Sequence, residues 1–236
     1  MAARQPRLSL ADLPTDVAIQ IMGNLAATSE RPMDDLLALR VTCRRMHLMC
    51  RNPKVGRRIN VTGLNDMAWH TPDAYHTFVP RLAQLGNLEA NFIHGVNVIF
   101  RGPVITPLAV LDENLERATA GGHEVAAYVS TILLYMANGG AGVDATARQY
   151  MRQAIMVVDN ICTRPVGVRD DMFRECFRIR QSAAHVVWRR WRRRSIRVAP
   201  APPRANLPCA GEDYGVALEW SWRQYCSEDC WMRGKI

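Results

Sequence analysis

The sequence predicts an all-α fold, and three observations lead to this prediction. Apolar residues recur at helical spacing through most of residues 10–194. Glycine, proline and asparagine clusters separate these periodic segments. Small residues alternate with bulky ones in the central region, as in closely packed helical hairpins. With 236 residues and 48% hydrophobic residues, the chain is large enough to bury a core.

Residues 10–53 predict three short amphipathic helices. The first has Asp12 as its cap and Pro14 in its first turn, where a missing N–H costs nothing. We expect Asp34 to cap the second helix, and we expect the third to stop at Asn52-Pro53. The apolar positions of the three helices are Val17, Ile21, Met22 and Leu25; Leu36, Leu37, Leu39 and Val41; and Cys43, Met46, Met49 and Cys50.

This apolar stripe is too large for the small core that three short helices can form. Helices of this length are marginal alone, because each must bury a face to offset the cost of its nucleation. We therefore expect another polypeptide to cover part of the stripe. The segment is predicted to be an interaction module.

Several residues of this segment are similar to those of an F-box, although Met46 stands where an F-box more often has an aromatic residue. They are Leu13-Pro14, Val17, Ile21 and Leu25, then Leu36 and the run Val41–Arg45. The resemblance implies an F-box over residues 8–55, which would dock on the Skp adaptor of cullin-RING ubiquitin ligases. The residues expected to touch the adaptor are Leu13, Pro14, Val17, Ile21, Leu25 and Leu36.

Residues 56–102 are predicted to form a connector followed by a helix. Residues 55–80 look short and irregular, with an extended stretch near residues 55–61 and many turn formers after it. His70 and His76 are expected to be exposed loop histidines, because a proline between them denies them a common helix face. Apolar spacing over residues 80–102 predicts one helix and then a glycine-punctuated turn.

Residues 103–194 are predicted to form a helical domain. Gly121-Gly122 is expected to close one helix, His123-Glu124 to open the next, and residues 138–142 to close that one. A set of residues in this domain resembles a Sel-type repeat, a relative of the tetratricopeptide hairpin. The set consists of Arg117-Ala118, Ala120–His123, Ala127-Tyr128, Leu133–Tyr135, Gly139–Gly142, Ala147 and Tyr150. About one and a half units are visible, so we expect this region to lean on neighbouring helices.

The carboxyl-terminal part is predicted to be a proline-rich linker, 195–208, and a tail, 209–236, that carries cysteines. Cys209, Cys226 and Cys230 could share a zinc ion, although a structural zinc site needs four ligands. Residues 225–231 are similar to the latter half of a MYND-type zinc finger, and the tail resembles the reduced cysteine tail of some plant F-box proteins with Sel-type repeats. No cofactor is certain, and a poorly ordered tail is the alternative.

The formal net charge of +8 belongs to one segment, because nine arginines and no acidic residue lie between Glu175 and Glu212. The densest part is Arg189, Arg190, Arg192, Arg193 and Arg194. An alternative function is nucleic-acid binding through residues 188–197, with salt-dependent affinity. A solvated helix face or a nuclear-import signal is preferred, since no reading helix or sheet accompanies the segment.

No catalytic constellation is present: there is no glycine-rich phosphate loop with lysine, no nucleophile elbow and no tuned carboxylate pair. The sequence also predicts no membrane span and no secretory signal. The F-box resemblance implies a non-catalytic substrate receptor of an SCF-type ligase, with the Skp adaptor, the cullin complex and an unknown target as partners. We expect it to lie in the nucleus or the cytoplasm.

Overall fold

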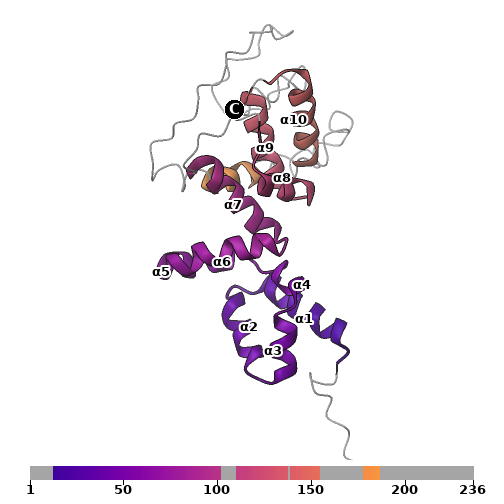
Figure 1. Cartoon of the computed structure of the whole chain (residues 1–236), viewed down its shortest axis with the longest axis vertical. Coiled ribbons are helices and arrows are strands. Elements are labelled where there is room, and N and C mark those ends of the chain that lie inside the picture. The colour runs from indigo at the N-terminus through magenta and orange to yellow at the C-terminus, as the bar shows by residue number, and fades with distance from the viewer. Residues whose placement is uncertain (1–12, 102–109, 138, 155–177, 187–236) are drawn as a thin grey trace, which may run out of the picture. The chain divides into compact units, whose positions relative to one another are not determined.

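The computed structural model describes residues 13–101, 110–137, 139–154 and 178–186. Over these ranges the regular elements are helices, without strands, which confirms the all-α prediction (Figure 1). The chain divides into two compact units: Met1–Arg101 with Asp112–His123, and Gly102–Leu111 with Glu124–Ile236. Each unit is described by itself.

The first unit begins with the three predicted helices and a fourth short one. They are α1 (Thr15–Thr28), α2 (Pro32–Arg40), α3 (Arg44–Cys50) and α4 (Pro53–Gly56). Pro14 is the N-cap of α1, and the predicted cap Asp12 lies outside the described residues. The prediction for Asp34 was wrong: α2 already begins at Pro32, whose fixed φ suits the first turn, and Asp34 lies inside that turn.

The predicted stop at Asn52-Pro53 is confirmed, and the same two residues begin α4. The Asn52 side-chain oxygen accepts a hydrogen bond of 2.9 Å from the Lys54 N–H, which satisfies a free donor of the first turn. At the start of α3, the Cys43 sulfur accepts from the Met46 N–H at 3.5 Å. In both cases the residue just before the helix supplies the side chain that caps it.

Small and flexible side chains fill the interior of these four helices. Ala18, Met22 and Ala26 of α1 are almost fully buried, as are Met46 and Met49 of α3. Alanine lets helix backbones approach closely, and methionine adapts to irregular gaps. The buried set is completed by Leu36 of α2 and Val55 of α4.

The expectation of an irregular connector up to residue 80 was wrong. The chain forms a 3₁₀ turn (Thr62–Leu64), α5 (Asn65–His70) and α6 (Pro72–Gln84), and α6 continues through Pro80. A proline inside a helix costs one backbone hydrogen bond, and the buried side chains of Val79, Leu82 and Ala83 offset this cost. His70 and His76 are exposed, but the expectation that they lie in a loop was wrong, because His70 ends α5 and His76 lies in α6.

The single helix expected over residues 80–102 is two helices. α6 ends before Gly86, whose φ of 87° favours glycine, and α7 (Leu88–Arg101) follows. The glycine-punctuated stretch that was expected after the helix is itself helical through Gly95, and Gly95 lies against Leu115 of α8 (Glu113–Ala120). A Cβ atom on Gly95 would lie 2.7 Å from the Leu115 backbone nitrogen. Glycine therefore sets how closely α7 and α8 pack.

The second unit contains the predicted central hairpin. Gly121 and Gly122 end α8 of the first unit, and α9 (Glu124–Ala137) and α10 (Ala141–Ala154) follow in the second (Figure 1). Gly140, with φ of 92°, precedes α10 directly. The Thr131 hydroxyl of α9 donates to the carbonyl oxygens of Ala127 at 2.9 Å and Ala147 at 3.1 Å. Residues 178–186 are also helical, and Arg178 pairs with Glu124 at 2.8 Å.

Candidate docking surface

Large apolar side chains of the first three helices remain exposed to solvent. On α1, Val17 and Ile21 are 37% and 43% exposed, and on α2 and its C-cap, Leu37 and Val41 are 56% and 75% exposed. Leu48 of α3 is 59% exposed. We call these five residues the docking surface. Apolar side chains exposed in groups mark sites where another molecule binds.

The helical repeat explains why the docking surface exists. On α1, Val17 and Ile21 are four residues apart and lie on one face, whereas Ala18, Met22 and Ala26 lie on the opposite, buried face. Leu37 and Val41 have the same spacing at the end of α2. These helices therefore carry more apolar residues than their own core can bury, as the sequence predicted.

The residues predicted to touch an adaptor fall into three classes of exposure. Val17, Ile21 and Pro14 are exposed, and Leu13 and Leu25 are half-buried. Leu36 is only 5% exposed, so its side chain belongs to the domain core. Sequence reasoning left Leu37, Val41 and Leu48 out of the expected contacts. The adjacent leucines of α2 gave no means of deciding which one faces inward.

A hydrogen bond between residues far apart in sequence holds the start of α1 in place. An Nη of Arg45 on α3 donates to the carbonyl oxygen of Leu13 at 2.5 Å, across 32 residues of sequence. A guanidinium donor makes a stronger hydrogen bond than a neutral group. Arg45 thus fixes Leu13 and Pro14 at the amino-terminal end of the docking surface.

Cys50 is half-buried, and its surroundings do not activate its thiol. Its thiol is 3.6 Å from the Met22 sulfur, and burial raises the pKa of Cys50, an effect that nearby Arg40 partly opposes. A raised pKa keeps the thiol protonated, and the protonated form is a poor nucleophile. Cys50 therefore has a packing role.

The first four helices are fastened to the helices that follow. The Asn87 side-chain nitrogen donates to the carbonyl oxygens of Gly56 at 3.1 Å and Ile59 at 2.9 Å, and Arg57 Nε donates to the Leu85 carbonyl at 2.8 Å. The Asn87 oxygen also accepts from the Ala90 N–H at 3.0 Å, which caps α7. The docking surface is thus carried by a unit that extends to α8.

Comparison with known proteins agrees with this description of the amino-terminal helices. Residues 10–62 match the family model described as F-box-like. The F-box-like domain therefore contains α1 to α4 and the whole docking surface. An F-box-like region at this end of the chain is confirmed, whereas the bounds 8–55 stay a prediction.

A curated relative from Arabidopsis thaliana, named as an F-box protein, is 27% identical over 143 residues. The matched region is 59% of this chain and 36% of the relative, so the match spans about a third of the relative's length. No solved structure matches the chain. These findings agree with a plant-type F-box protein.

The remaining predicted sites lie outside the described residues. These are the cysteines of the tail, Cys209, Cys226 and Cys230, and the arginines Arg189, Arg190, Arg192, Arg193 and Arg194. Within the described ranges, His, Cys, Asp and Glu side chains form no group of three that could hold a metal. The same ranges contain no helix with the length and apolar character needed to cross a bilayer.

A hollow that sequence reasoning missed lies along α5 and α6. It has a volume of about 440 Å³ and is open to solvent. Trp69 of α5, 78% exposed, is the most exposed large apolar residue in the described part of the chain. The hollow is lined by Met67, Asp73, Ala74, Thr77, Phe78 and Arg81. Because residues 55–80 were predicted to be irregular, the amphipathic helix α6 was not expected.

Proposed function

We propose that this protein is a substrate-receptor subunit of an SCF-type cullin-RING ubiquitin ligase. The observation that carries the proposal is the docking surface of the F-box-like domain. Five large apolar side chains are exposed on three helices whose other faces form a complete small core. Burying them against the Skp adaptor would release the water that now covers them, and this release drives association.

The receptor would act by proximity and without chemistry of its own. One end of the chain would hold the adaptor and cullin, and another would hold the target, so that target lysines lie near the ubiquitin-charged conjugating enzyme. Tethering raises the effective concentration of the two reactants without any new catalytic group. The hydrogen bonds from Asn87 and Arg57 support this role, because they join the F-box-like domain to the helices that follow it within the first unit.

The central helices or the tail would bind the target. The α9–α10 hairpin, with the Thr131 hydroxyl bonded across it, supports a Sel-type arrangement in which paired helices present a binding face. A zinc ion held by the tail cysteines stays part of the proposal, as does action in the nucleus or the cytoplasm. Metal analysis of the purified complex tests the zinc site directly.

Co-expression tests the proposal as a whole. The full chain, produced together with a Skp adaptor and a cullin, is expected to elute with both in one peak on size exclusion. Elution of the chain apart from the adaptor would contradict the proposal. The chain with Trp69→Ala serves as a control, because Trp69 is highly exposed and lies outside residues 10–62.

A further inference from the structure

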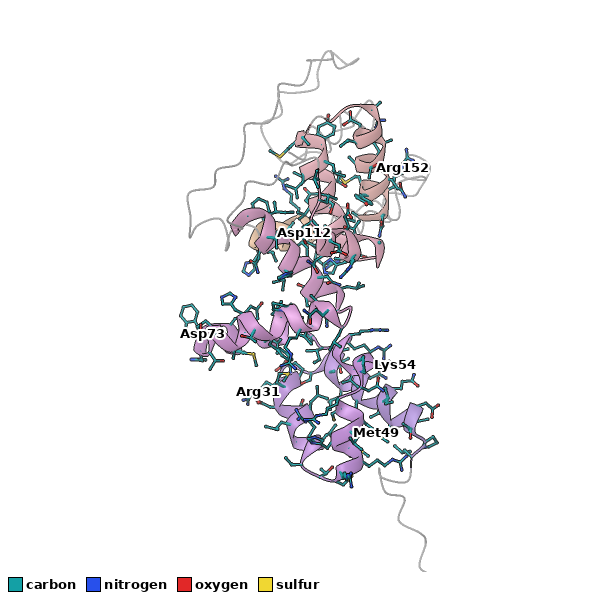
Figure 2. All side chains as sticks on the ribbon, in the orientation of Figure 1. Arg31, Met49, Lys54, Asp73, Asp112 and Arg152 are labelled. Atoms are coloured by element: carbon teal, nitrogen blue, oxygen red, sulfur yellow. The ribbon has the colours of Figure 1, made fainter. Side chains whose placement is uncertain are left out.

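Opposite charges lie at the two ends of the hollow along α5 and α6. Asp73 is in the first turn of α6 and Arg81 is in its last turn, and both residues are exposed. Figure 2 marks Asp73 near the start of the helix. About 12 Å of helix separates the two positions, which is too far for an ion pair within α6. In the described ranges, no ion pair joins either side chain to another residue.

Between the two charges, the hollow has an apolar floor and a small residue at its centre. Met67, Ala74 and Phe78 supply the apolar side chains, and Thr77 lies midway between the charged residues. The Thr77 hydroxyl donates to the Asp73 carbonyl oxygen at 2.8 Å. A second helix can therefore approach closely here and cover the floor without leaving a buried hydroxyl donor unpaired.

The row formed by Asp73, Thr77 and Arg81, which we call the α6 row, is its own complement under a half-turn. Residues four apart along a helix form a ridge, and two such ridges interdigitate in the commonest class of helix packing. If two copies of α6 pack antiparallel with Thr77 at the crossing point, Asp73 of each copy lies opposite Arg81 of the other. A two-fold interface requires such a self-complementary patch.

Exposed apolar side chains lie beyond both ends of the α6 row. Trp69 of α5 is 78% exposed, and Leu85, the C-cap of α6, is 37% exposed. Only Thr71 separates α5 from α6 (Figure 1). The antiparallel arrangement brings Trp69 of one copy to the end of the interface where Leu85 of the other copy lies. Burying these side chains together with the floor of the hollow would drive the association.

We propose that α5 and α6 form a homodimer interface, in which two copies of this chain pack α6 against α6 about a two-fold axis near Thr77. Charge complementarity identifies the occupant of the hollow. A different protein would need a base opposite Asp73 and an acid opposite Arg81, at the same spacing along an apolar ridge, and this chain already carries that set.

The inference goes beyond the proposed function and does not depend on it. The α6 row lies outside residues 10–62 and shares no residue with the docking surface. A dimer formed through α6 would therefore carry two docking surfaces, one on each copy.

Light scattering after size exclusion tests the proposal with the full chain at low ionic strength. A single helix crossing is a small interface, so we expect a dissociation constant on the order of 10 μM. Above that concentration, the measured mass is expected to approach twice the chain mass of 26.6 kDa.

Charge reversal gives a test that only a two-fold interface passes. Asp73→Arg leaves two positive charges in the α6 row, and Arg81→Asp leaves two negative ones, so each variant alone is expected to dimerise at least about tenfold more weakly. An equimolar mixture of the two variants is expected to form a mixed dimer with wild-type affinity, because both ends then pair opposite charges. The double variant is expected to dimerise as the wild type does, for the same reason.

Glu116→Arg is the matched control, because it reverses an exposed acidic residue of α8 and is expected to leave the dimer intact. A wild-type chain that stays monomeric at about ten times the expected dissociation constant would overturn the proposal and leave the hollow to a different protein. Monomers in the mixture, with both variants folded by circular dichroism, would also overturn it. Undiminished dimerisation of both single variants would contradict it as well, since the contact would then lie elsewhere.

Discussion

The side-chain amide of Asn87 donates a 2.9 Å hydrogen bond to the carbonyl oxygen of Ile59, 28 residues earlier in the chain. Asn87 is only 2% exposed, so both groups are shielded from water. The same amide caps α7 and bonds to Gly56. One side chain thus satisfies backbone groups at the end of the F-box-like domain and at the start of the helices that follow.

Asn87→Ala should lower the stability of the first unit substantially. It removes the side-chain partner of the Ile59 carbonyl oxygen and of the Ala90 N–H, whereas the Gly56 carbonyl oxygen still accepts from the Ile59 N–H at 3.4 Å; each buried unsatisfied group costs about 1 to 3 kcal/mol. We expect a loss of at least about 2 kcal/mol in the free energy of unfolding, measured by urea denaturation. Gln84→Ala is the control, because Gln84 is exposed. Equal stability of the two variants would remove the role given to Asn87.

Two glycine substitutions should have opposite effects. Gly95→Ala places a Cβ atom 2.7 Å from the Leu115 nitrogen and forces α7 and α8 apart, at a cost of about 1 to 3 kcal/mol. Gly142→Ala in α10 meets nothing within 4 Å and should stabilise by roughly 0.5 to 1 kcal/mol, because alanine loses less backbone entropy. Thermal unfolding of both variants measures the difference. Stabilisation by Gly95→Ala would contradict the close packing of α7 on α8.

The side chains of His123 and Glu89 should be energetically coupled. His123 Nε2 lies 2.6 Å from a Glu89 carboxylate oxygen in a partly buried setting, and the His123 ring stacks on Phe92 at 4.9 Å. A double-mutant cycle with alanine at both positions is expected to give about 1 kcal/mol of coupling. Arg31 and Asp34 form an exposed pair of similar length, for which surface screening predicts at most about 0.5 kcal/mol. Equal coupling energies in the two pairs would contradict the expectation that partial burial strengthens the interaction of His123 with Glu89.

The sequence predicted those elements whose boundaries are marked by local chemistry. Gly122 and Gly140 follow or precede the central helices where expected, because glycine readily adopts their positive φ. The excess of apolar residues over residues 10–53 likewise predicted an exposed surface, since a small core can bury only part of it. Both inferences needed no knowledge of long-range contacts.

The elements that the sequence did not predict depend on contacts between distant residues. Pro80 breaks an isolated helix, yet α6 continues through it because Val79 and Leu82 are buried by tertiary packing. Gly95 is a residue type common in turns, but here it lies within a helix. Its closeness to Leu115, 20 residues away, explains why a residue without a side chain is needed at this position. In the docking surface, Leu36 and Leu37 are neighbours in sequence, and only the packing of α2 shows which one is buried.

The most direct test of the claim that the docking surface binds a Skp adaptor is a comparison of two affinities. Isothermal titration calorimetry measures the affinity of the adaptor for the wild-type chain and for the double variant Val17→Ala, Ile21→Ala. The variant removes five side-chain carbons that the adaptor would bury, at about 0.8 kcal/mol each. Because Val17 and Ile21 are 37% and 43% exposed, the adaptor can newly bury about two fifths of that surface, which predicts a loss of roughly 1.6 kcal/mol, or about fifteenfold weaker binding. The covered parts of both side chains contribute to folding, so we expect the variant to lose about 1 kcal/mol of unfolding free energy and to stay folded. Undiminished affinity in a folded variant would contradict the account.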